Sequence, residues 1–309
     1  MRVATIDIGT NTVLLLVAER GRDGKLVAVR EEATITRLGE GVDVARVLKP
    51  EAIERTRVCL ESYARIVRTL AVDAISVVGT SAMRDAGGGD AIRSKVYELF
   101  GVDARTISGD EEASVTFHGA LSGLALADGD VAVFDIGGGS TEIVQGSIVD
   151  GRAQAVRYAH SFDVGSVRMT ERHVRSDPPS ADELSALASQ VRAAFSSVPA
   201  PKAGTRVVGI AGTITTLVAV ALKMDPYDGA RVHGHTLPRE TIVALIASLS
   251  AMPLAIRKTS CGLEPKRADV IVAGAIIASV VCEVLGAEAL IASDRGVRWG
   301  LAEALLSTR

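Results

Sequence analysis

The stretch "VFDIGGGSTEIVQG" at residues 133–146 decides the fold. An apolar, strand-like segment reaches Asp135, passes through the small residues Gly137–Thr141, and returns to alternating apolar and polar residues. A hairpin turn needs only two residues, so this loop exposes more backbone than the turn requires. Glycine permits positive φ and close approach, which lets consecutive N–H groups converge on an anion. The stretch therefore predicts a β-hairpin that binds an anion.

A second copy of this pattern, "VATIDIGTNTVLLLVAE", lies at residues 3–19. It aligns with "VAVFDIGGGSTEIVQGS" at 131–147, and Asp7 lies 128 residues before Asp135. Each copy has an apolar strand, an Asp-Ile-Gly turn, a small polar loop and a second strand. An internal repeat of this kind predicts that the two halves of the chain fold alike.

The segments that follow each hairpin also correspond. In the first half we expect strands at 25–38, 74–80 and 104–108, and helices at 50–70, 90–100 and from 110. In the second half we expect strands at 153–162, 206–213 and 288–293, and helices at 181–195, from 213, at 239–250, at 268–285 and from 296. Strands that alternate with helices after a three-strand meander indicate an α/β fold with a mixed sheet.

The fold prediction is thus α/β, with two domains of βββαβαβα type on either side of an interdomain cleft. We expect the first domain at 1–126 and the second at 127–309, with the final helix, about 296–309, packing back on the first domain. A chain of 309 residues is long enough for two such domains.

Composition excludes several classes of protein. The net charge is −3 and no basic arm exists, so binding of nucleic acid by phosphate neutralisation is not expected. The longest apolar stretch, 270–282, is shorter than the roughly 20 residues of a membrane span. The N-terminus lacks the pattern of a signal peptide. Cys59, Cys261 and Cys282 have no metal-ligand spacing, which favours reduced thiols and a cytoplasmic location.

Carboxylates flank the glycine-rich loops. Asp135 and Glu142 stand at either end of the second loop, and Asp7 precedes the first. A sparse set of carboxylate oxygens, completed by water and phosphate, suits Mg²⁺ or Mn²⁺. The alternative is that Asp7 and Asp135 only cap their own turns.

Two further segments suggest chemistry on phosphate. Ser108 and Glu111 have the spacing of a capping box, which places Glu112 in the first helical turn, where it could act as a base towards water. Arg84 follows a strand and could grip phosphate oxygens in bidentate fashion. The alternatives are that Glu112 only supports the helix start and that Arg84 forms a surface ion pair.

The candidate phosphate-binding residues lie in turns and offer either a glycine backbone or a small polar side chain. They are Gly9, Thr10, Asn11, Thr12, Thr80, Ser81, Gly137, Gly138, Gly139, Ser140, Thr141, Gly212 and Thr213. The last two lie in "GIAGT", where a helix N-terminus offers a further seat for an anion. Neither a dinucleotide-binding fingerprint nor a Walker A loop is present. Arg257, Lys258, Lys266 and Arg267 form either a solvated surface or a basic lip that guides a polyanion.

The motifs together resemble the exopolyphosphatase and guanosine pentaphosphate phosphohydrolase (Ppx/GppA) family, of the actin-like ATPase superfamily. The resemblance covers essentially the whole chain. Its carriers are DIGTNT at 7–12, GTSAMR at 79–84, SGDEEA at 108–113, DIGGGSTE at 135–142, GIAGTITTL at 209–217, KRADVIVAG at 266–274 and SDRGVRWG at 293–300. It implies two ribonuclease-H-like domains.

The resemblance also implies roles for single residues. Glu112 matches the family's catalytic glutamate, Asp135 and Glu142 match its metal-associated acids, and Arg84 matches its substrate-gripping arginine. Thr10 and Thr12 stand where many members have serine. Long members append helical domains after the region with which this chain ends, so we do not take long-chain processivity as implied by the resemblance. By analogy with relatives we expect a homodimer.

These features predict metal-dependent release of terminal orthophosphate from inorganic polyphosphate. The alternative is hydrolysis of pppGpp, which uses the same phosphate chemistry; the small number of aromatic residues slightly favours polyphosphate. An ATP-dependent kinase of the same superfamily would need an acceptor pocket, and SGDEEA argues against it. A non-enzymatic actin-like protein would polymerise with nucleotide and tolerate loss of Glu112.

Overall fold

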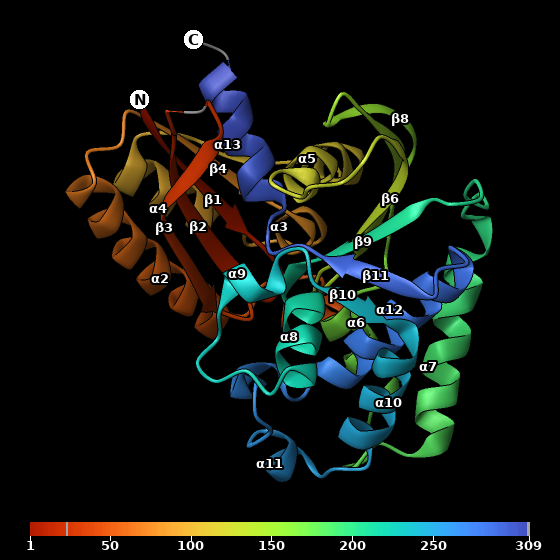
Figure 1. Ribbon diagram of the computed structural model, residues 1–309. Helices are drawn as coiled ribbons and strands as arrows, with labels where there is room; N and C mark the ends of the chain where they lie inside the picture. Colours follow the sequence, from red (N-terminus) through yellow and green to blue (C-terminus); the bar gives the residue numbers. More distant parts are fainter. Residues whose placement is uncertain (23, 308–309) are drawn as a thin grey trace. The chain divides into compact units, whose positions relative to one another are not determined.

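The computed structural model describes residues 1–22 and 24–307 of the chain (Figure 1). Contacts between residues divide it into two compact units. Unit 1 comprises residues 1–119 together with the chain from Val297 onward, and unit 2 comprises residues 120–296. The sequence places the boundary at 126/127, whereas the two units meet at 119/120, inside a helix.

Unit 1 contains a five-stranded sheet in the order β3-β2-β1-β4-β5. β1 runs antiparallel to β2 and parallel to β4. The elements of unit 1 are β1 (Arg2–Ile8), β2 (Thr12–Arg20), β3 (Leu26–Ile35), α1 (Val42–Ala45), α2 (Pro50–Thr69), β4 (Ala74–Gly79), α3 (Ser81–Asp85), α4 (Asp90–Phe100), β5 (Ala104–Thr106), most of α5 (Gly109–Leu121), and α13 (Val297–Ser307).

α2 covers one face of this sheet. The helix begins with Pro50 at its first position, where a missing N–H costs nothing. Its buried residues, including Leu60 and Tyr63, recur at helical spacing and pack on the strands. The Tyr63 hydroxyl donates to the carbonyl of Val13 at 3.0 Å, and burial raises the pKa of this phenol. α2 is thereby fixed to β2.

α13 covers the other face of the same sheet (Figure 1). Trp299 and Ala302 pack with Val3 and Leu16. The Arg298 guanidinium donates to the carbonyl of Leu15 at 3.0 Å through Nη1. The last helix and the first two strands therefore share one apolar cluster.

Unit 2 contains a six-stranded sheet in the order β10-β11-β9-β6-β7-β8. Its elements are β6 (Gly129–Ile136), β7 (Thr141–Val149), β8 (Arg152–Phe162), α6 (Ser166–His173), α7 (Ala181–Ala194), η1 (Phe195–Ser197), β9 (Arg206–Ile210), α8 (Ala211–Ala221), α9 (Gly229–Val232), β10 (Thr236–Pro238), α10 (Arg239–Ser250), α11 (Leu254–Arg257), η2 (Pro265–Arg267), α12 (Ile271–Val284) and β11 (Ala289–Ala292).

The strand order of unit 2 repeats that of unit 1: β8, β7, β6, β9 and β11 correspond in turn to β3, β2, β1, β4 and β5. Unit 2 has one more strand, β10, which lies antiparallel to β11 at the edge of the sheet. β6 pairs antiparallel with β7 and parallel with β9, as β1 does with β2 and β4. The predicted pair of α/β domains with mixed sheets is confirmed.

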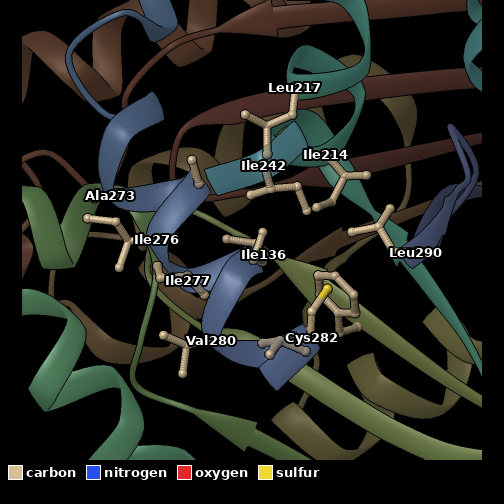
Figure 2. Close-up of a cluster of buried hydrophobic side chains, with 14 of the residues drawn as sticks. Ile136, Ile214, Leu217, Ile242, Ala273, Ile276, Ile277, Val280, Cys282 and Leu290 are labelled. Carbon is tan, nitrogen blue, oxygen red and sulfur yellow. The ribbon is translucent and has the colours of Figure 1, made fainter. Parts of the chain in front are cut away.

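The core of unit 2 is built around α12. Figure 2 shows its side chains Ala273, Ile276, Ile277 and Val280 packed among apolar residues of the sheet and of the neighbouring helices. The helix is apolar over most of its length because neighbours surround it, and the exposed Glu283 lies in its last turn. Among residues 1–22 and 24–307, none of the helices combines the length and apolarity that crossing a bilayer demands. Cys282 lies on the same helix and packs in this core, and burial raises the pKa of its thiol to about 12.

Some boundaries differ from the sequence prediction. α8 begins at Ala211 rather than Thr213, and β3 ends at Ile35 rather than at residue 38. The chain after β3 leaves the sheet because the amides of Thr36, Arg37 and Gly39 bind the first glycine-rich loop instead of a strand. The prediction also lacked the short elements α1, α3, α6, α9, α11 and β10.

Candidate active site

The first glycine-rich loop, residues 9–12, is held through its carbonyl groups. The amide of Gly9 donates to the carbonyl of Thr12 at 3.1 Å and closes the turn. The carbonyl of Thr10 accepts from Gly39, and that of Asn11 accepts from Thr36 and Arg37, at 2.8–3.1 Å. In a trans peptide the next N–H points opposite to the carbonyl. The amide of Asn11 therefore points away from the segment that holds the loop.

The second loop, residues 137–141, has the same arrangement. The amide of Gly137 donates to the carbonyl of Ser140 at 3.0 Å. The first amides of α6 supply the holding bonds, because a helix leaves them without partners of its own. Ser166 donates to the carbonyl of Gly137 at 2.9 Å, and Val167 donates to that of Gly138 at 2.9 Å. The amides of Gly138 and Gly139 consequently point away from α6.

Each holding segment contains a glycine where a side chain would not fit. A Cβ on Gly39 would overlap the Cγ2 of Thr10, and a Cβ on Gly165 would overlap the backbone of Gly138. Each segment directly follows the third strand of its own sheet. The internal repeat thus extends beyond the hairpins to the parts that hold them.

The two carboxylates of unit 2 lie side by side. Asp135 on β6 is the direct cross-strand partner of Glu142 on β7, so both side chains project from the same face of the sheet. Glu142 is buried, with 1% of its surface exposed, and accepts a 2.6 Å hydrogen bond from the Ser161 hydroxyl. Within the chain that the structure describes, no three potential metal-ligating His, Cys, Asp or Glu residues cluster. Two adjacent carboxylates fit Mg²⁺, which usually retains water and phosphate ligands.

Asp7 occupies the matching position in unit 1. It lies on β1 opposite Leu14 of β2 and beside Val78 of β4. The second strand of unit 1 therefore carries a leucine where unit 2 carries Glu142. The paired carboxylates belong to unit 2 alone.

Arg84 and Glu112 meet in unit 1. Arg84 Nη1 lies 3.3 Å from Glu112 Oε2 and donates to the carbonyl of Ile107 at 3.2 Å. Arg84 belongs to the short helix α3 rather than directly to a strand end. Glu112 is buried, which distinguishes it from a glutamate that only supports a solvated helix start.

Ser108 caps the start of α5, while the Glu111 side chain has a different partner. The Glu111 amide donates to Ser108 Oγ at 3.1 Å, as the capping box predicts. The Glu111 carboxylate, however, pairs with Arg105 at 2.9 Å. Glu111 therefore serves the helix surface, and Glu112 is the inward-facing acid.

The other predicted residues of unit 1 lie at the same sheet edge. Thr80 follows β4, and its amide donates to the carbonyl of Ile8 at 3.3 Å. Ser81 Oγ donates to Asp85 at 3.1 Å. Because β1 and β4 are parallel, their carboxyl ends bring the first loop and the start of α3 together.

Comparison with known proteins identifies the family. Residues 16–308 match the Ppx/GppA phosphatase family. The chain belongs to the Ppx/GppA phosphatase family. It is 38% identical to exopolyphosphatase 2 of Mycobacterium tuberculosis, over 98% of both chains. Among solved structures, the Ppx/GppA family member of Aquifex aeolicus is 32% identical with a TM-score of 0.83, covering 100% of this chain and 99% of that one. An exopolyphosphatase-like protein is 31% identical with a TM-score of 0.90, over 100% and 99% of the two chains.

In this Ppx/GppA chain the start of α8 is a crowded helix N-terminus. Ala211 has φ 67°, a left-handed conformation that is uncommon for alanine. The guanidinium of Arg267 lies against Gly212, where a Cβ would overlap it, and burial lowers the pKa of Arg267. Thr213 is buried, and its side chain packs against Gly274 of α12. Arg267 is thus at the predicted anion seat.

The four basic residues predicted as a guiding lip have different surroundings. Lys258 and Lys266 are exposed. The prediction for Arg257 is wrong, because only 3% of this residue is exposed. Its guanidinium donates to the carbonyls of Leu249, Met252 and Ala268, so Arg257 ties α10, α11 and the following loop together.

Sequence reasoning missed the residues that hold the loops. Gly39, Gly165 and Arg168 lie outside the quoted motifs of the Ppx/GppA resemblance, yet they contact the loop backbones. One signal was available for the glycines. Each follows the third strand of its half by a few residues, which an extended comparison of the two halves would have detected.

Proposed function

We propose that this chain is an exopolyphosphatase, a metal-dependent hydrolase that releases orthophosphate from the end of inorganic polyphosphate. The observation that carries the proposal is the duplicated glycine-rich loop, in which the carbonyls of Thr10, Asn11, Gly137 and Gly138 accept hydrogen bonds from the holding segments. The amides of Asn11, Gly138 and Gly139 therefore point away from these segments. The near full-length similarity to exopolyphosphatase 2 of Mycobacterium tuberculosis supports polyphosphate as the substrate.

We assign the binding of phosphate oxygens to the amides of Asn11, Gly138 and Gly139. Donors fixed before the substrate arrives stabilise the developing charge without reorganising. Phosphoryl transfer depends mainly on such positioning and on charge stabilisation. The exposed Lys258 and Lys266 are proposed to attract the rest of the polymer.

Glu112 is the proposed base. A water molecule attacks the terminal phosphorus, Glu112 accepts the water proton, and the bridging P–O bond breaks, so that the electron pair leaves with the shortened polymer. Arg84 holds the Glu112 carboxylate through the 3.3 Å ion pair and keeps it oriented. The role of Arg84 in gripping the substrate belongs to the same proposal.

Asp135 and Glu142 would hold Mg²⁺ or Mn²⁺. When bound, such an ion would neutralise charge on the phosphate oxygens. The Ser161 hydroxyl donates to Oε1 of Glu142, which restrains the rotation of this carboxylate. Asp7 is proposed as a further, weaker contributor.

The test is release of orthophosphate by the purified chain. Polyphosphate and pppGpp are offered at equal concentrations of terminal phosphate, each with Mg²⁺, with Mn²⁺ and with EDTA, and Glu112→Gln serves as the control for contaminating phosphatases. We expect metal-dependent release from polyphosphate that exceeds release from pppGpp. Faster turnover of pppGpp, or release that needs a phosphate acceptor, would overturn the assignment.

Assembly and location are separate proposals. We propose a homodimer located in the cytoplasm, with no nucleic acid or membrane partner. Sedimentation of the purified chain tests the first point, and fractionation of cells that express it tests the second.

A further inference from the structure

Arg168 is a buried arginine directly behind the second glycine-rich loop. It lies in the first turn of α6, and only 5% of its surface is exposed. Its Nε donates to the carbonyl of Gly139 at 2.6 Å, and its own amide donates to the carbonyl of Gly138 at 3.1 Å. One residue thus contacts two consecutive peptides of the loop.

Burial of a guanidinium is costly unless its donors are satisfied. The ion pair of Arg168 with Asp163 does little to repay this cost, because the two groups are 3.6 Å apart and Asp163 is 78% exposed. A methionine of similar length would fill the same space without the cost. The short bond from Nε to the carbonyl of Gly139 is a contact that methionine could not make at this position.

The two loops differ at this point. In unit 1 the carbonyls of Thr10 and Asn11 are held by the backbone amides of Gly39, Thr36 and Arg37. In unit 2 the backbone amides of α6 supply the equivalent bonds, and the guanidinium of Arg168 adds one to Gly139. The second loop is the one that lies between the paired carboxylates Asp135 and Glu142.

The bond to Gly139 determines the direction of the next amide. Because the peptide is planar and trans, a carbonyl of Gly139 that points at Arg168 turns the amide of Ser140 the opposite way. A cation on the carbonyl also polarises the peptide, which makes its N–H a stronger donor. Arg168 therefore acts on the anion-binding side of the loop without reaching it.

We propose that Arg168 is a positioning residue of the phosphate-binding loop, which orients the amide of Ser140 towards a phosphate oxygen of the substrate. The proposal rests on the proposed function, since that function assigns the amides of this loop to the substrate. The role proposed for Arg168 is an addition to that function, because Arg168 acts through the Gly139 peptide and does not contact phosphate.

The experiment compares Arg168→Met and Arg168→Lys with Arg172→Met. Arg172 is exposed on the same helix and serves as the matched loss of a positive charge. We expect Arg168→Met to lower kcat/KM for polyphosphate by about 10²-fold, mainly through kcat, because small misplacements of catalytic donors cost this much. Arg168→Lys keeps the positive charge and can still donate a hydrogen bond, but it lacks the planar guanidinium. We therefore expect its kcat/KM to fall by about tenfold. The kcat/KM of Arg172→Met should stay within about twofold of the wild-type value.

Thermal unfolding and phosphate binding separate positioning from folding. Arg168→Lys should melt within a few degrees of the wild type, and its calorimetric affinity for inorganic phosphate should fall with its kcat. If Arg168→Met does not fold, Arg168→Lys decides the question. Wild-type kinetics and phosphate affinity in a folded Arg168→Lys or Arg168→Met would overturn the proposal.

The same series distinguishes this inference from the proposed function. If the wild type binds inorganic phosphate but does not hydrolyse polyphosphate, the proposed function fails. The loss of phosphate affinity in the Arg168 variants, with Arg172→Met unchanged, would still support the positioning role. If the wild type hydrolyses polyphosphate and the Arg168 variants match it, only the inference fails.

Discussion

Arg84 Nη1 lies 3.3 Å from Oε2 of Glu112, across 28 residues of sequence that contain α4 and β5. The guanidinium comes from the short helix α3 and the carboxylate from the first turn of α5. The same nitrogen donates to the carbonyl of Ile107, two residues before the start of α5 at Gly109. Arg84 thus fixes both the position of the α5 start and the orientation of its buried acid.

Glu112→Gln tests the role of this acid. The amide keeps the size of the side chain and cannot accept a proton from water. We expect kcat for polyphosphate to fall by about 10²–10⁴-fold, the usual share of a general base, while KM changes little. Glu111→Gln is the matched control, because this neighbour pairs with Arg105 on the surface. Steady-state phosphate release gives kcat and KM for Glu112→Gln and for Glu111→Gln. Full activity of Glu112→Gln would show that another group activates the water.

Gly39→Ala tests the fit between the first loop and its holding segment. The new methyl group would overlap the Cγ2 of Thr10, so we expect a loss of about 1–3 kcal/mol in unfolding free energy, as for overpacking. Thr10→Ser removes that Cγ2 and keeps the hydroxyl. The double variant should therefore recover most of the loss, with a coupling energy of about 1 kcal/mol or more. Urea unfolding of the four proteins measures this cycle; additive losses would contradict the contact.

Ala211→Gly tests the left-handed conformation at the start of α8. An alanine at φ 67° is strained by roughly 1–2 kcal/mol, and glycine relieves this strain while losing about 0.4–1 kcal/mol through the unfolded chain. We expect a net gain of about 1 kcal/mol or less in unfolding free energy. Ala186→Gly, at an exposed site inside α7, should instead lose about 1 kcal/mol. A destabilised Ala211→Gly would show that the backbone at this position is not strained.

Glu183 gives a prediction for pH dependence. Hydrogen bonds from the Ser176 hydroxyl and the Ser180 amide lower the pKa of Glu183 to about 2, from an ordinary value of 4.5. A lowered pKa contributes stability that is fully present above the unfolded-state value and is lost as pH falls through the folded-state value. Glu183→Gln should therefore be less stable than the wild type at pH 7, and the difference should shrink between about pH 4.5 and pH 2.

The measurement for Glu183 is thermal unfolding across this pH range. Asp182→Asn, at the exposed neighbouring position, is the control and should show a much smaller pH-dependent difference. A difference between Glu183→Gln and the wild type that stays constant down to pH 2 would contradict the lowered pKa. The test is specific because glutamine retains the shape of the capping box around Ser180.

The sequence predicted the architecture well because the repeat constrains it twice. The two Asp-Ile-Gly hairpins imposed one strand order on both halves, and long helices such as α2 showed a clear apolar period. Short elements were missed for a physical reason. α3 has five residues and β10 has three, which is less than two turns or a readable alternation.

The candidate site could be predicted only in part. Glu112 and Arg84 were recognised as separate residues, and their ion pair depends on how β4, β5 and α5 meet. Arg257 and Lys258 are adjacent in sequence, yet one is buried and the other exposed, because helix orientation rather than charge decides burial. Arg168 could not be found from pattern alone, since nothing in "GSVR" indicates that the side chain turns back to a loop 29 residues earlier.

The packing of α13 on β1 and β2 has a consequence for the order in which the protein matures during translation. The Arg298 guanidinium bonds to the carbonyl of Leu15, 283 residues earlier, and Trp299 shares a cluster with Val3. The ribosome therefore releases the earliest strands long before the helix that shields them exists. Vectorial synthesis normally lets the amino-terminal domain finish first. Here unit 2 can be complete while the sheet of unit 1 still lacks α13, and that nascent sheet is the surface a chaperone would encounter.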